Sequence, residues 1–282
     1  MNLYKQLLIF VILANILVWM AIFTFPNNSL RIIACDIGQG DAILITYKDF
    51  QVLTDGGPDS SVINCLSKYM PFWDRTIEVM ILTNPDLDHL GGLISVVKQY
   101  KIEKYIKSPT IDSTQSYKVL EDLVGSKGIP TYEASSALDI QFSLMYLDIV
   151  YPNQEDRATF KNPQNNYSTV FKLTFKDFEA VFTGDIEEEA SDYIAKNIYL
   201  GDIDYIKIPH HGSKHGITRS LLEVTKPEIA VISAGKNNKY GHPHAQILEM
   251  LQEKGVKILG TYDQGDVVVE IDESGRDIIY RQ

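Results

Sequence analysis

A short polar segment at residues 84–89 places three side chains that bind divalent metals within four positions. Asp86, Asp88 and His89 directly follow an apolar segment that is typical of a buried strand. Side chains in a loop at a strand end can converge on one point. Two carboxylates and an imidazole form a donor set suited to a divalent metal ion. The alternative is that one of the aspartates only caps the helix that follows, a common role for Asp.

Three further segments favour a shared metal site over independent helix caps. Asp185 ends a second apolar strand segment, and the adjacent histidines His210 and His211 end a third. His242 and His244 follow a fourth. Adjacent histidines that leave a strand into a glycine turn are unusual as core residues, so we expect one of the two to be a metal ligand. Four strand ends with Asp or His, in a chain with only 6 histidines, indicate one site.

The elements that must position these residues follow from the alternation of apolar segments and turn residues. Strand-like segments at 30–38, 41–48 and 51–57 come first, separated and followed by glycine-rich turns. Strands and helices then alternate, with the closing strands near 256–260 and 266–271. This order predicts an α/β fold in which two sheets pack together with helices outside.

Length and composition are those of an ordinary globular protein. The 282 residues suffice for a sizeable core, and 45% hydrophobic and 22% charged residues are typical values. The formal net charge of −11 argues against a protein that coats DNA regardless of sequence, because the phosphate backbone selects basic surfaces. For the two cysteines, Cys35 and Cys65, we expect separate buried thiols rather than a disulfide.

An apolar N-terminal segment, residues 7–25, is long enough to suggest a membrane anchor. It is interrupted only by Asn15 and Thr24, and at about 1.5 Å per residue it nearly crosses a hydrocarbon core of about 30 Å. A cleaved signal peptide is the alternative, but no small-residue cleavage site follows. We therefore expect a single-pass anchor over residues 1–28 and one folded domain over residues 29–282.

Taken together, the motifs resemble the metallo-β-lactamase domain of ComEC-type DNA-uptake (competence) proteins. The resemblance rests on six segments in order along the chain: DIGQGD at 36–41, DGG at 55–57, PDLDHLGG at 85–92, GD at 184–185, PHHGS at 209–213 and NKYGHPH at 238–244. It implies an αββα sandwich, the metallo-β-lactamase fold, with a metal site at the edge between two halves. It also implies that metal-activated water attacks an ester, typically a phosphodiester. Full competence proteins carry a polytopic channel domain, so this chain looks like a stand-alone, membrane-anchored relative.

The resemblance also assigns roles to individual residues. One metal ion would be held by four side chains: Asp88, His89, Asp185 and His210. Asp86 would belong to the neighbouring metal position, and Asp88 would also take part in catalysis. His244 or His242 would donate to the leaving oxygen or hold a phosphoryl oxygen. Positions that orient a ligand or meet the substrate are expected at Asp55, Asn84, His211, Ser213 and Lys214.

Lysines close to these motifs suggest a positive rim on an otherwise acidic protein, as an anionic substrate would need. They are Lys207, Lys214, Lys236 and Lys239. Ordinary exposed lysines are the alternative.

Asn84 departs from the pattern of the family. Hydrolases of this fold commonly begin the loop as HxHxDH, and here Asn84 and Asp86 occupy the two leading histidine positions. Neutral Asn is a poor metal ligand beside His or Asp. The segment 165–168 lacks a histidine as well. We expect one or two divalent ions, manganese or zinc, with oxygen ligands shifting the preference towards manganese or magnesium; a degenerate site is the third state left open.

These observations predict a metal-dependent hydrolase, a phosphodiesterase or nuclease that acts on DNA at the cell envelope. The soluble domain would lie outside the cytoplasm, and a separate uptake channel protein would be a partner. Two alternatives stay open. One is a non-catalytic module that holds nucleic acid or protein at the membrane, and the other is a hydrolase of small phosphoesters. β-Lactam hydrolysis is not expected, because the leading histidines are absent.

Overall fold

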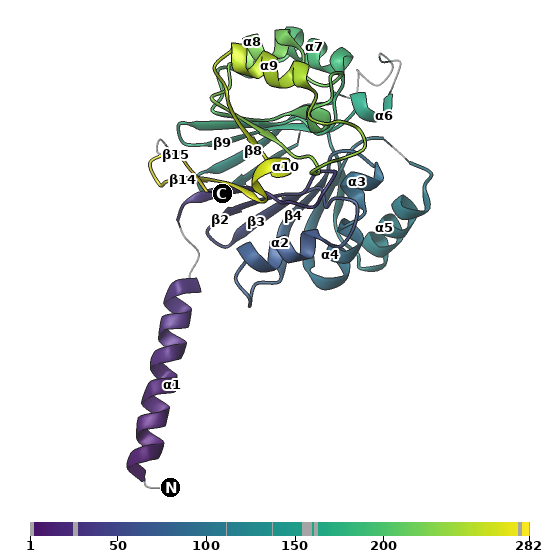
Figure 1. The fold of residues 1–282 in the computed structure, drawn as a ribbon. Coiled ribbons are helices and arrows are strands. Elements are labelled where there is room, and N and C mark those ends of the chain that lie inside the picture. Colours follow the sequence, from purple (N-terminus) through teal and green to yellow (C-terminus); the bar gives the residue numbers. More distant parts are fainter. Residues whose placement is uncertain are drawn as a thin grey trace.

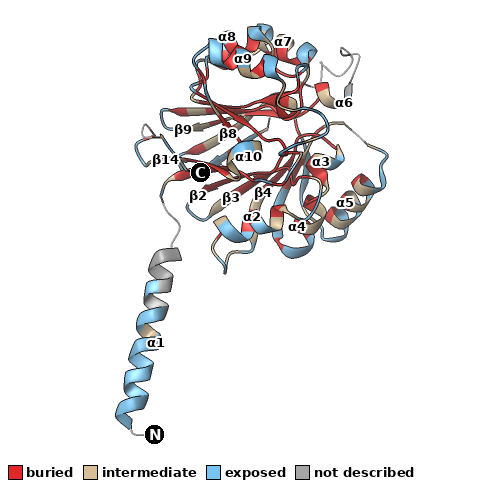
Figure 2. Ribbon diagram, viewed as in Figure 1, coloured by how far each residue is buried: buried red, intermediate tan, exposed pale blue. Residues whose placement is uncertain are grey.

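Two β-sheets packed face to face form the centre of the molecule, and helices cover the outer face of each sheet (Figure 1). Buried residues concentrate in the two sheets, while the outward sides of the helices are exposed (Figure 2). This computed structural model describes residues 3–24, 28–110, 112–136, 138–153, 160, 163–275 and 278–281.

The first sheet has 8 strands in the order β15-β14-β1-β2-β3-β4-β5-β6. Their bounds are β1 Leu30–Ala34, β2 Ile43–Tyr47, β3 Phe50–Thr54, β4 Thr76–Leu82, β5 Lys101–Lys107, β6 Thr131–Glu133, β14 Val267–Ile271 and β15 Ile278–Arg281. β1 to β3 form an antiparallel meander, whereas β3 to β6 run parallel. Parallel neighbours need crossover connections. Helices supply them: α2 Val62–Tyr69, α3 Leu87–Leu90, α4 Leu93–Gln99 and α5 Gln115–Ser126.

The second sheet has 7 strands in the order β13-β12-β11-β10-β9-β8-β7. Their bounds are β7 Asp139–Phe142, β8 Met145–Tyr151, β9 Val170–Phe175, β10 Phe178–Phe182, β11 Tyr205–Lys207, β12 Ile229–Ile232 and β13 Lys257–Gly260. β7 to β10 are antiparallel and β10 to β13 parallel. The parallel half is crossed by α7 Glu188–Asn197, α8 Arg219–Thr225 and α9 Ala245–Glu253, while α6 Pro163–Asn166 precedes β9 and α10 Thr261–Gln264 follows β13.

Three apolar clusters fill the spaces between these layers. The central one lies between the sheets, where Phe171 and Phe182 stack with ring centroids 4.5 Å apart. A second lies between the first sheet and its helices, with Leu93 and Val97 of α4 fully buried. The third, on the other side, includes Leu251 of α9. Strands covered on both faces have no solvent-facing side, which is why β2 and β12 are buried at every position.

The predicted αββα sandwich is therefore confirmed, and the closing strands predicted near 256–260 and 266–271 correspond to β13 and β14. The expectation for the cysteines is wrong. Cys35, just after β1, and Cys65, in α2, form a disulfide with their Cα atoms 5.9 Å apart. α2 packs on the face of the first sheet beside the end of β1, and this contact brings together two residues separated by 30 positions.

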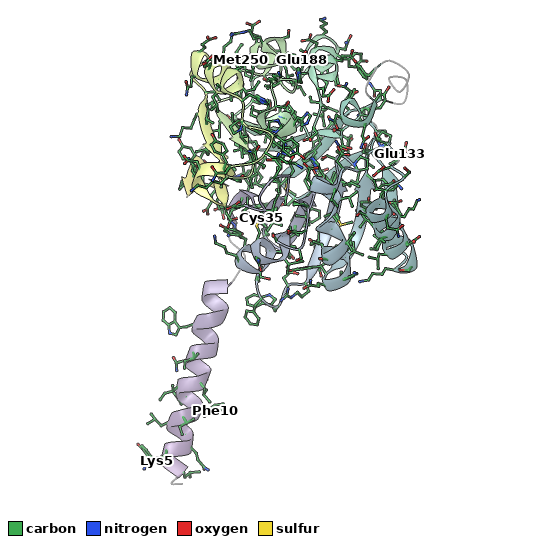
Figure 3. The ribbon with its side chains drawn as sticks, turned by 45° about the vertical axis from the view of Figure 1, so that its right-hand side comes forward. Lys5, Phe10, Cys35, Glu133, Glu188 and Met250 are labelled. Carbon is green, nitrogen blue, oxygen red and sulfur yellow. A yellow bond between two sulfur atoms is a disulfide. The ribbon has the colours of Figure 1, made fainter. Side chains whose placement is uncertain are left out.

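The N-terminal helix α1 (Leu3–Thr24) stands apart from the sandwich, and Figure 3 shows Lys5 and Phe10 on it well clear of the folded domain. Within the part of the chain that the structure describes, no helix combines the length and the apolarity that a membrane crossing requires. This finding contradicts the predicted single-pass anchor and the predicted location at the cell membrane.

Candidate metal centre

The candidate centre lies at one edge of the sandwich, where polar loops leave strands of both sheets. The short helix α3, which follows β4, carries Asp88 and His89; the turn after β10 carries Asp185, and the turn after β11 carries His211. Parallel strands direct their carboxyl ends to the same edge, so residues distant in sequence meet there.

His89 is fully buried, and its ring is oriented by a carboxylate behind it. Its Nδ1 lies 2.8 Å from Oδ2 of Asp55. Asp55 in turn accepts hydrogen bonds of 2.8 Å and 2.5 Å from the backbone N–H and the hydroxyl of Thr83. A carboxylate on Nδ1 fixes the proton there and leaves Nε2 free to bind a cation. Nε2 points the other way, 3.1 Å from Oδ2 of Asp185 but outside hydrogen-bond geometry.

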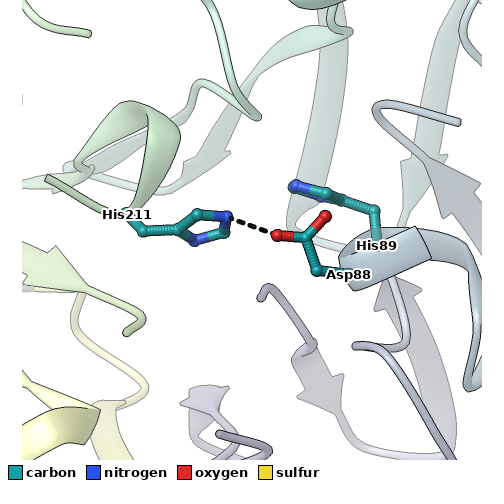
Figure 4. A group of neighbouring side chains, drawn as sticks. All are labelled: Asp88, His89 and His211. Atoms are coloured by element: carbon teal, nitrogen blue, oxygen red, sulfur yellow. Dashed lines mark ion pairs between the residues drawn. The ribbon is translucent and has the colours of Figure 1, made fainter. Parts of the chain in front are cut away.

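His211 is presented in the same manner from the other sheet. Its Nδ1 lies 3.0 Å from the carbonyl oxygen of Ser233, so Nδ1 carries the proton and Nε2 faces the centre. Nε2 is 3.4 Å from Oδ2 of Asp88 and 3.4 Å from Oδ2 of Asp185. Figure 4 shows Asp88 between the rings of His89 and His211.

The backbone of the turn that holds His211 is left-handed at two successive non-glycine residues. In the 3₁₀ turn Pro209–Gly212, φ is 51° at His210 and 56° at His211. Left-handed conformations cost energy for residues with a Cβ atom and recur at functional sites. Because of this turn the two adjacent rings diverge, and only the ring of His211 enters the centre.

His210 therefore lies outside the cluster to which the sequence assigned it. Its ring is a quarter exposed, and its Nδ1 is 4.0 Å from Oε1 of Glu187. His211, expected only in a supporting position, takes its place beside Asp88 and His89, with one donor atom of each residue within 4.8 Å of the others.

The neighbouring position is occupied by amides. Asn84 is fully buried and donates from Nδ2 to Oδ1 of Asn165 at 2.9 Å. Nδ2 of Asn165 donates to Oε1 of Glu187 at 3.0 Å. The side-chain oxygen of Asn84 accepts from the backbone N–H of Asp86. The Asp86 carboxylate is hydrogen-bonded by Gln164. No metal-ligating group found among the described residues includes Asp86.

Two further residues of the centre were not predicted as site residues. Asp41 and Lys207 are buried and form an ion pair; Lys207 also donates to the Gly184 carbonyl at 3.2 Å and lies 3.9 Å from Oδ1 of Asp185. Lys207 is thus part of the centre, and its expected place in a positive rim is wrong. The sequence signal that could have pointed to Asp41 is the DIGQGD motif, which ends in this residue. Its Gly40 packs closely against the centre, since a Cβ there would lie 2.2 Å from the Asp88 carbonyl oxygen.

Opposite charges are concentrated in this small buried volume. Burial alone works against the charged imidazolium of His89 and of His211, but the carboxylates of Asp185, Asp55 and Asp41 outweigh it and raise both pKa values well above the usual range. Burial likewise opposes the charged form of Asp185, yet the two histidines hold the pKa of this carboxyl well below its usual value. Without a metal, the attraction between the protonated histidines and the surrounding carboxylates stabilises the centre.

A cleft of 280 Å³ opens onto the cluster. Its lining residues are Gln39, Asp86, Leu87, Asp88, Asp185, His210, His211, Tyr240 and His242. Burial, followed by the neighbouring histidines His211, His210 and His244, lowers the pKa of His242 to about 4, so this ring is neutral at neutral pH.

Of the residues predicted to meet substrate, His242 lies on the cleft wall and His244 lies behind it. Their ring centroids are 5.0 Å apart, and Nδ1 of His244 accepts from the backbone N–H of Lys214 at 3.3 Å. Ser213 is buried, and its hydroxyl accepts from the N–H of His215. Of the residues expected to orient a ligand or meet the substrate, the structure therefore places His211 and His242 on the cleft.

The sequence matches the model of the metallo-beta-lactamase superfamily over residues 35–236, which is most of the chain and contains all members of the cluster. The chain belongs to the metallo-β-lactamase superfamily. The predicted family is confirmed, and the αββα sandwich described above is the fold that the resemblance implied.

Two curated relatives of this metallo-β-lactamase domain are much longer proteins. ComE operon protein 3 of Bacillus subtilis is 27% identical over 251 residues, which cover 82% of this chain and 32% of that protein. Recombination protein 2 of Haemophilus influenzae is 27% identical over 241 residues, which cover 83% of this chain and 28% of that protein. The chain spans about a third of the length of the curated relatives it matches.

Solved structures share the metallo-β-lactamase fold at low sequence identity. YhfI of Bacillus subtilis has a TM-score of 0.57 and 9% identity, covering 86% of this chain and 99% of YhfI. A putative metal-dependent hydrolase of Parabacteroides distasonis has a TM-score of 0.52 and 16% identity, covering 84% and 99%. CmlA of Streptomyces venezuelae, a diiron β-hydroxylase, has a TM-score of 0.52 and 11% identity, covering 83% and 52%. One fold thus carries different chemistries, and function must be argued from the site.

The donor atoms of this metallo-β-lactamase domain fit a divalent metal ion. Buried Nε2 atoms of His89 and His211 and Oδ1 of Asp185 have no hydrogen-bond partner, which is costly unless a cation satisfies them. Two imidazoles with the carboxylates of Asp88 and Asp185 are a common donor set for zinc, manganese or iron.

Proposed function

We propose that this metallo-β-lactamase domain is a metal-dependent phosphodiesterase that cleaves DNA. The observation that carries the proposal is the cluster of Asp88, His89, Asp185 and His211 beside an open cleft, in which Nε2 of both histidines and Oδ1 of Asp185 are buried without a hydrogen-bond partner. When bound there, a divalent ion supplies Lewis acidity and a nucleophile at neutral pH.

The protein's own part in the reaction is to orient these groups and to handle protons. Asp55 and the carbonyl of Ser233 hold the protons on the Nδ1 atoms of His89 and His211, so both Nε2 atoms stay directed into the centre. His242 contributes a neutral imidazole whose Nδ1 is buried without a hydrogen-bond partner. In that position it can hydrogen-bond a phosphoryl oxygen or the leaving oxygen of a substrate in the cleft.

Two observations support a nucleic-acid substrate. Exposed lysines Lys214, Lys236 and Lys239 lie on the loops beside the cleft, and they offer positive charge to a phosphate backbone on a protein of net charge −11. One relative is named for recombination, a process on DNA. We extend the proposal to a separate DNA-uptake channel protein as a partner, on the strength of the resemblance to competence proteins.

A hydrolase of small phosphoesters is the second candidate. The cleft volume of 280 Å³ is at the low end for small-molecule sites, so a single phosphoester group fills much of it.

The test uses the purified full chain with manganese or zinc, single-stranded DNA and the small diester bis(p-nitrophenyl) phosphate. We expect cleavage of both, and a loss of at least about 100-fold in Asp185→Asn, because orienting partners alone are worth about 10- to 100-fold. Asp202→Asn, a change at an exposed carboxylate paired with Lys226, should leave the rate unchanged. Cleavage of the small diester alone would favour the second candidate, and no metal binding with no effect of Asp185→Asn would leave a non-catalytic module.

A further inference from the structure

The mouth of the cleft carries two exposed apolar side chains on opposite elements. Leu87 begins α3 and is 57% exposed, and Tyr240, in the loop between β12 and α9, is 52% exposed. Both line the cleft whose floor is made of carboxylates and imidazoles. A bare phosphate or a metal ion uses neither of them. Their presence points to a ligand that has an apolar face next to its charged group.

The tyrosine ring is packed against the wall of the cleft. It stacks on the ring of His242, with centroids 5.7 Å apart and an angle of 24° between the planes. His242 in turn adjoins His210 and His211, with centroids 5.8 Å and 6.3 Å away. Tyr240 thus extends a series of rings from the metal cluster to the surface.

The side chain of Asn238 fixes the loop that presents Tyr240 through hydrogen bonds to its backbone. Asn238 donates from Nδ2 to the carbonyl oxygens of Gly235 (2.9 Å) and His242 (2.5 Å). Its Oδ1 accepts from the backbone N–H groups of Tyr240 (3.1 Å) and His242 (3.0 Å). Both N–H donors and both oxygen lone pairs of this amide are therefore used in fixing the loop. Preorganisation of this kind lowers the entropy lost on binding.

Cationic side chains lie on the same loop as Tyr240. Nζ of Lys239 lies 5.0 Å from the centroid of the Tyr240 ring. Lys236, three residues before Lys239, is exposed. Lys214 is exposed in the neighbouring turn, where its backbone N–H donates to Nδ1 of His244. An exposed aromatic ring with cations beside it is the arrangement that holds single-stranded nucleic acid, because bases stack on the ring while phosphates meet the charges. In a duplex the bases are already stacked on one another.

We propose that Tyr240 is a stacking platform for an unpaired nucleobase adjacent to the phosphodiester in the cleft, which makes single-stranded nucleic acid the preferred substrate. The inference rests on the proposed phosphodiesterase function for its biological use, but base stacking is measurable without cleavage.

The first experiment measures binding of the full chain to fluorescent oligothymidylate and to an abasic strand of the same length. We expect the wild type to bind the strand with bases about tenfold more tightly, the lower part of the range for one stacked base. Tyr240→Ala should abolish this preference, and Tyr240→Phe should keep it because the ring remains. Tyr199→Ala removes an exposed tyrosine that does not line the cleft, and it should behave as the wild type.

A second variant separates base contacts from phosphate contacts. Lys239→Gln should weaken binding of both strands equally and reduce the salt dependence, because a lysine meets phosphate and not base. Equal binding of the two strands by the wild type, or an equal loss on both strands in Tyr240→Ala, would overturn the platform.

Cleavage assays then show which of the two ideas fails. A wild type that prefers bases through Tyr240 but cleaves no strand supports the platform and contradicts the phosphodiesterase. A wild type that cleaves both strands equally, with no effect of Tyr240→Ala, overturns the platform and leaves the phosphodiesterase intact. If both hold, Tyr240→Ala should raise KM for oligothymidylate about tenfold, with kcat little changed and the abasic strand unaffected.

Discussion

The two neighbouring positions of the centre are built from different chemistry. On one side, His89 and His211 direct their Nε2 atoms at Asp88 and Asp185, and these nitrogen atoms have no hydrogen-bond partner. On the other side, the side chain of Asn84 donates to that of Asn165, which in turn donates to Glu187, so these amides are hydrogen-bonded within the protein. The first side needs a cation to be satisfied and the second does not.

This difference teaches how a two-site scaffold can be reduced to one site without loss of the fold. A buried polar group costs free energy only if it lacks a partner. The amide pair of Asn84 and Asn165 supplies its own partners, so replacing imidazoles there leaves no unpaired group behind. We therefore expect one tightly held metal ion, on the side of His89 and His211.

The largest effect is expected from the two adjacent histidines. His211→Ala should lose the metal ion and at least about 100-fold in kcat/KM, since it removes a donor and not only its support. His210→Ala should change both by less than about twofold, because its ring lies outside the cluster. Metal content by mass spectrometry and diester hydrolysis measure the two variants side by side. Metal loss in His210→Ala with retention in His211→Ala would reverse the assignment.

A smaller effect on metal affinity is expected from Asp55, which hydrogen-bonds the metal-ligand candidate His89. Asp55→Asn removes the charge that holds His89 in its tautomer, and metal affinity should fall by about 10- to 100-fold. Thr83→Val is the matched change, because it removes only the hydroxyl that donates to Asp55, and its effect should be weaker. Competition with a chelating dye gives both affinities. Unchanged affinity in Asp55→Asn would show that the carboxylate serves the fold alone.

The sequence was sufficient for the strand ends of this centre, because Asp and His that leave apolar segments are local signals. Asp88, His89 and Asp185 all lie where those signals placed them. The choice between His210 and His211 was not local. It depends on left-handed φ values at both histidines in the turn Pro209–Gly212, which the spacing of residues along the chain does not indicate.

Pairings across the fold were beyond sequence reasoning for the same reason. The buried pair of Lys207 with Asp41 joins residues from different sheets, and spacing alone gives no sign of it. The disulfide between Cys35 and Cys65 depends on how α2 packs on the first sheet. The αββα order was predictable, because strand and helix alternation is written along the chain.

Metal affinity should depend on pH, because His89 and His211 are protonated in the metal-free centre. The pKa values of His89 and His211 lie above the usual value of 6.5, so a metal ion must displace protons from them. Apparent metal affinity should rise with pH, by about tenfold per pH unit for each proton displaced, until the raised pKa values are passed. Calorimetry in buffers of different ionisation enthalpy counts the released protons.

The metal-free protein should show the opposite trend in stability. A histidine with a raised folded-state pKa stabilises the fold fully below its unfolded pKa near 6.5, and this contribution is lost as pH rises through the folded-state pKa. Thermal unfolding without metal should therefore occur at lower temperature as pH increases above about 6.5. The metal-loaded protein should not show this decline. A pH-independent affinity together with a flat stability curve would contradict the raised pKa values.

The most subtle test asks whether the amide side can be turned back into a metal position. Asn84→His with Asn165→His places two imidazoles beside Asp86 and Asp185, a donor set for about one additional divalent ion. Metal content should rise from about one to about two ions per chain, with a few-fold change in activity. Asn84→Ala with Asn165→Ala removes the same amide pair without adding donors, and its metal content should match the wild type. A second ion in the wild type would show that Asp86 and the amides already suffice, and would erase the difference between the two sides.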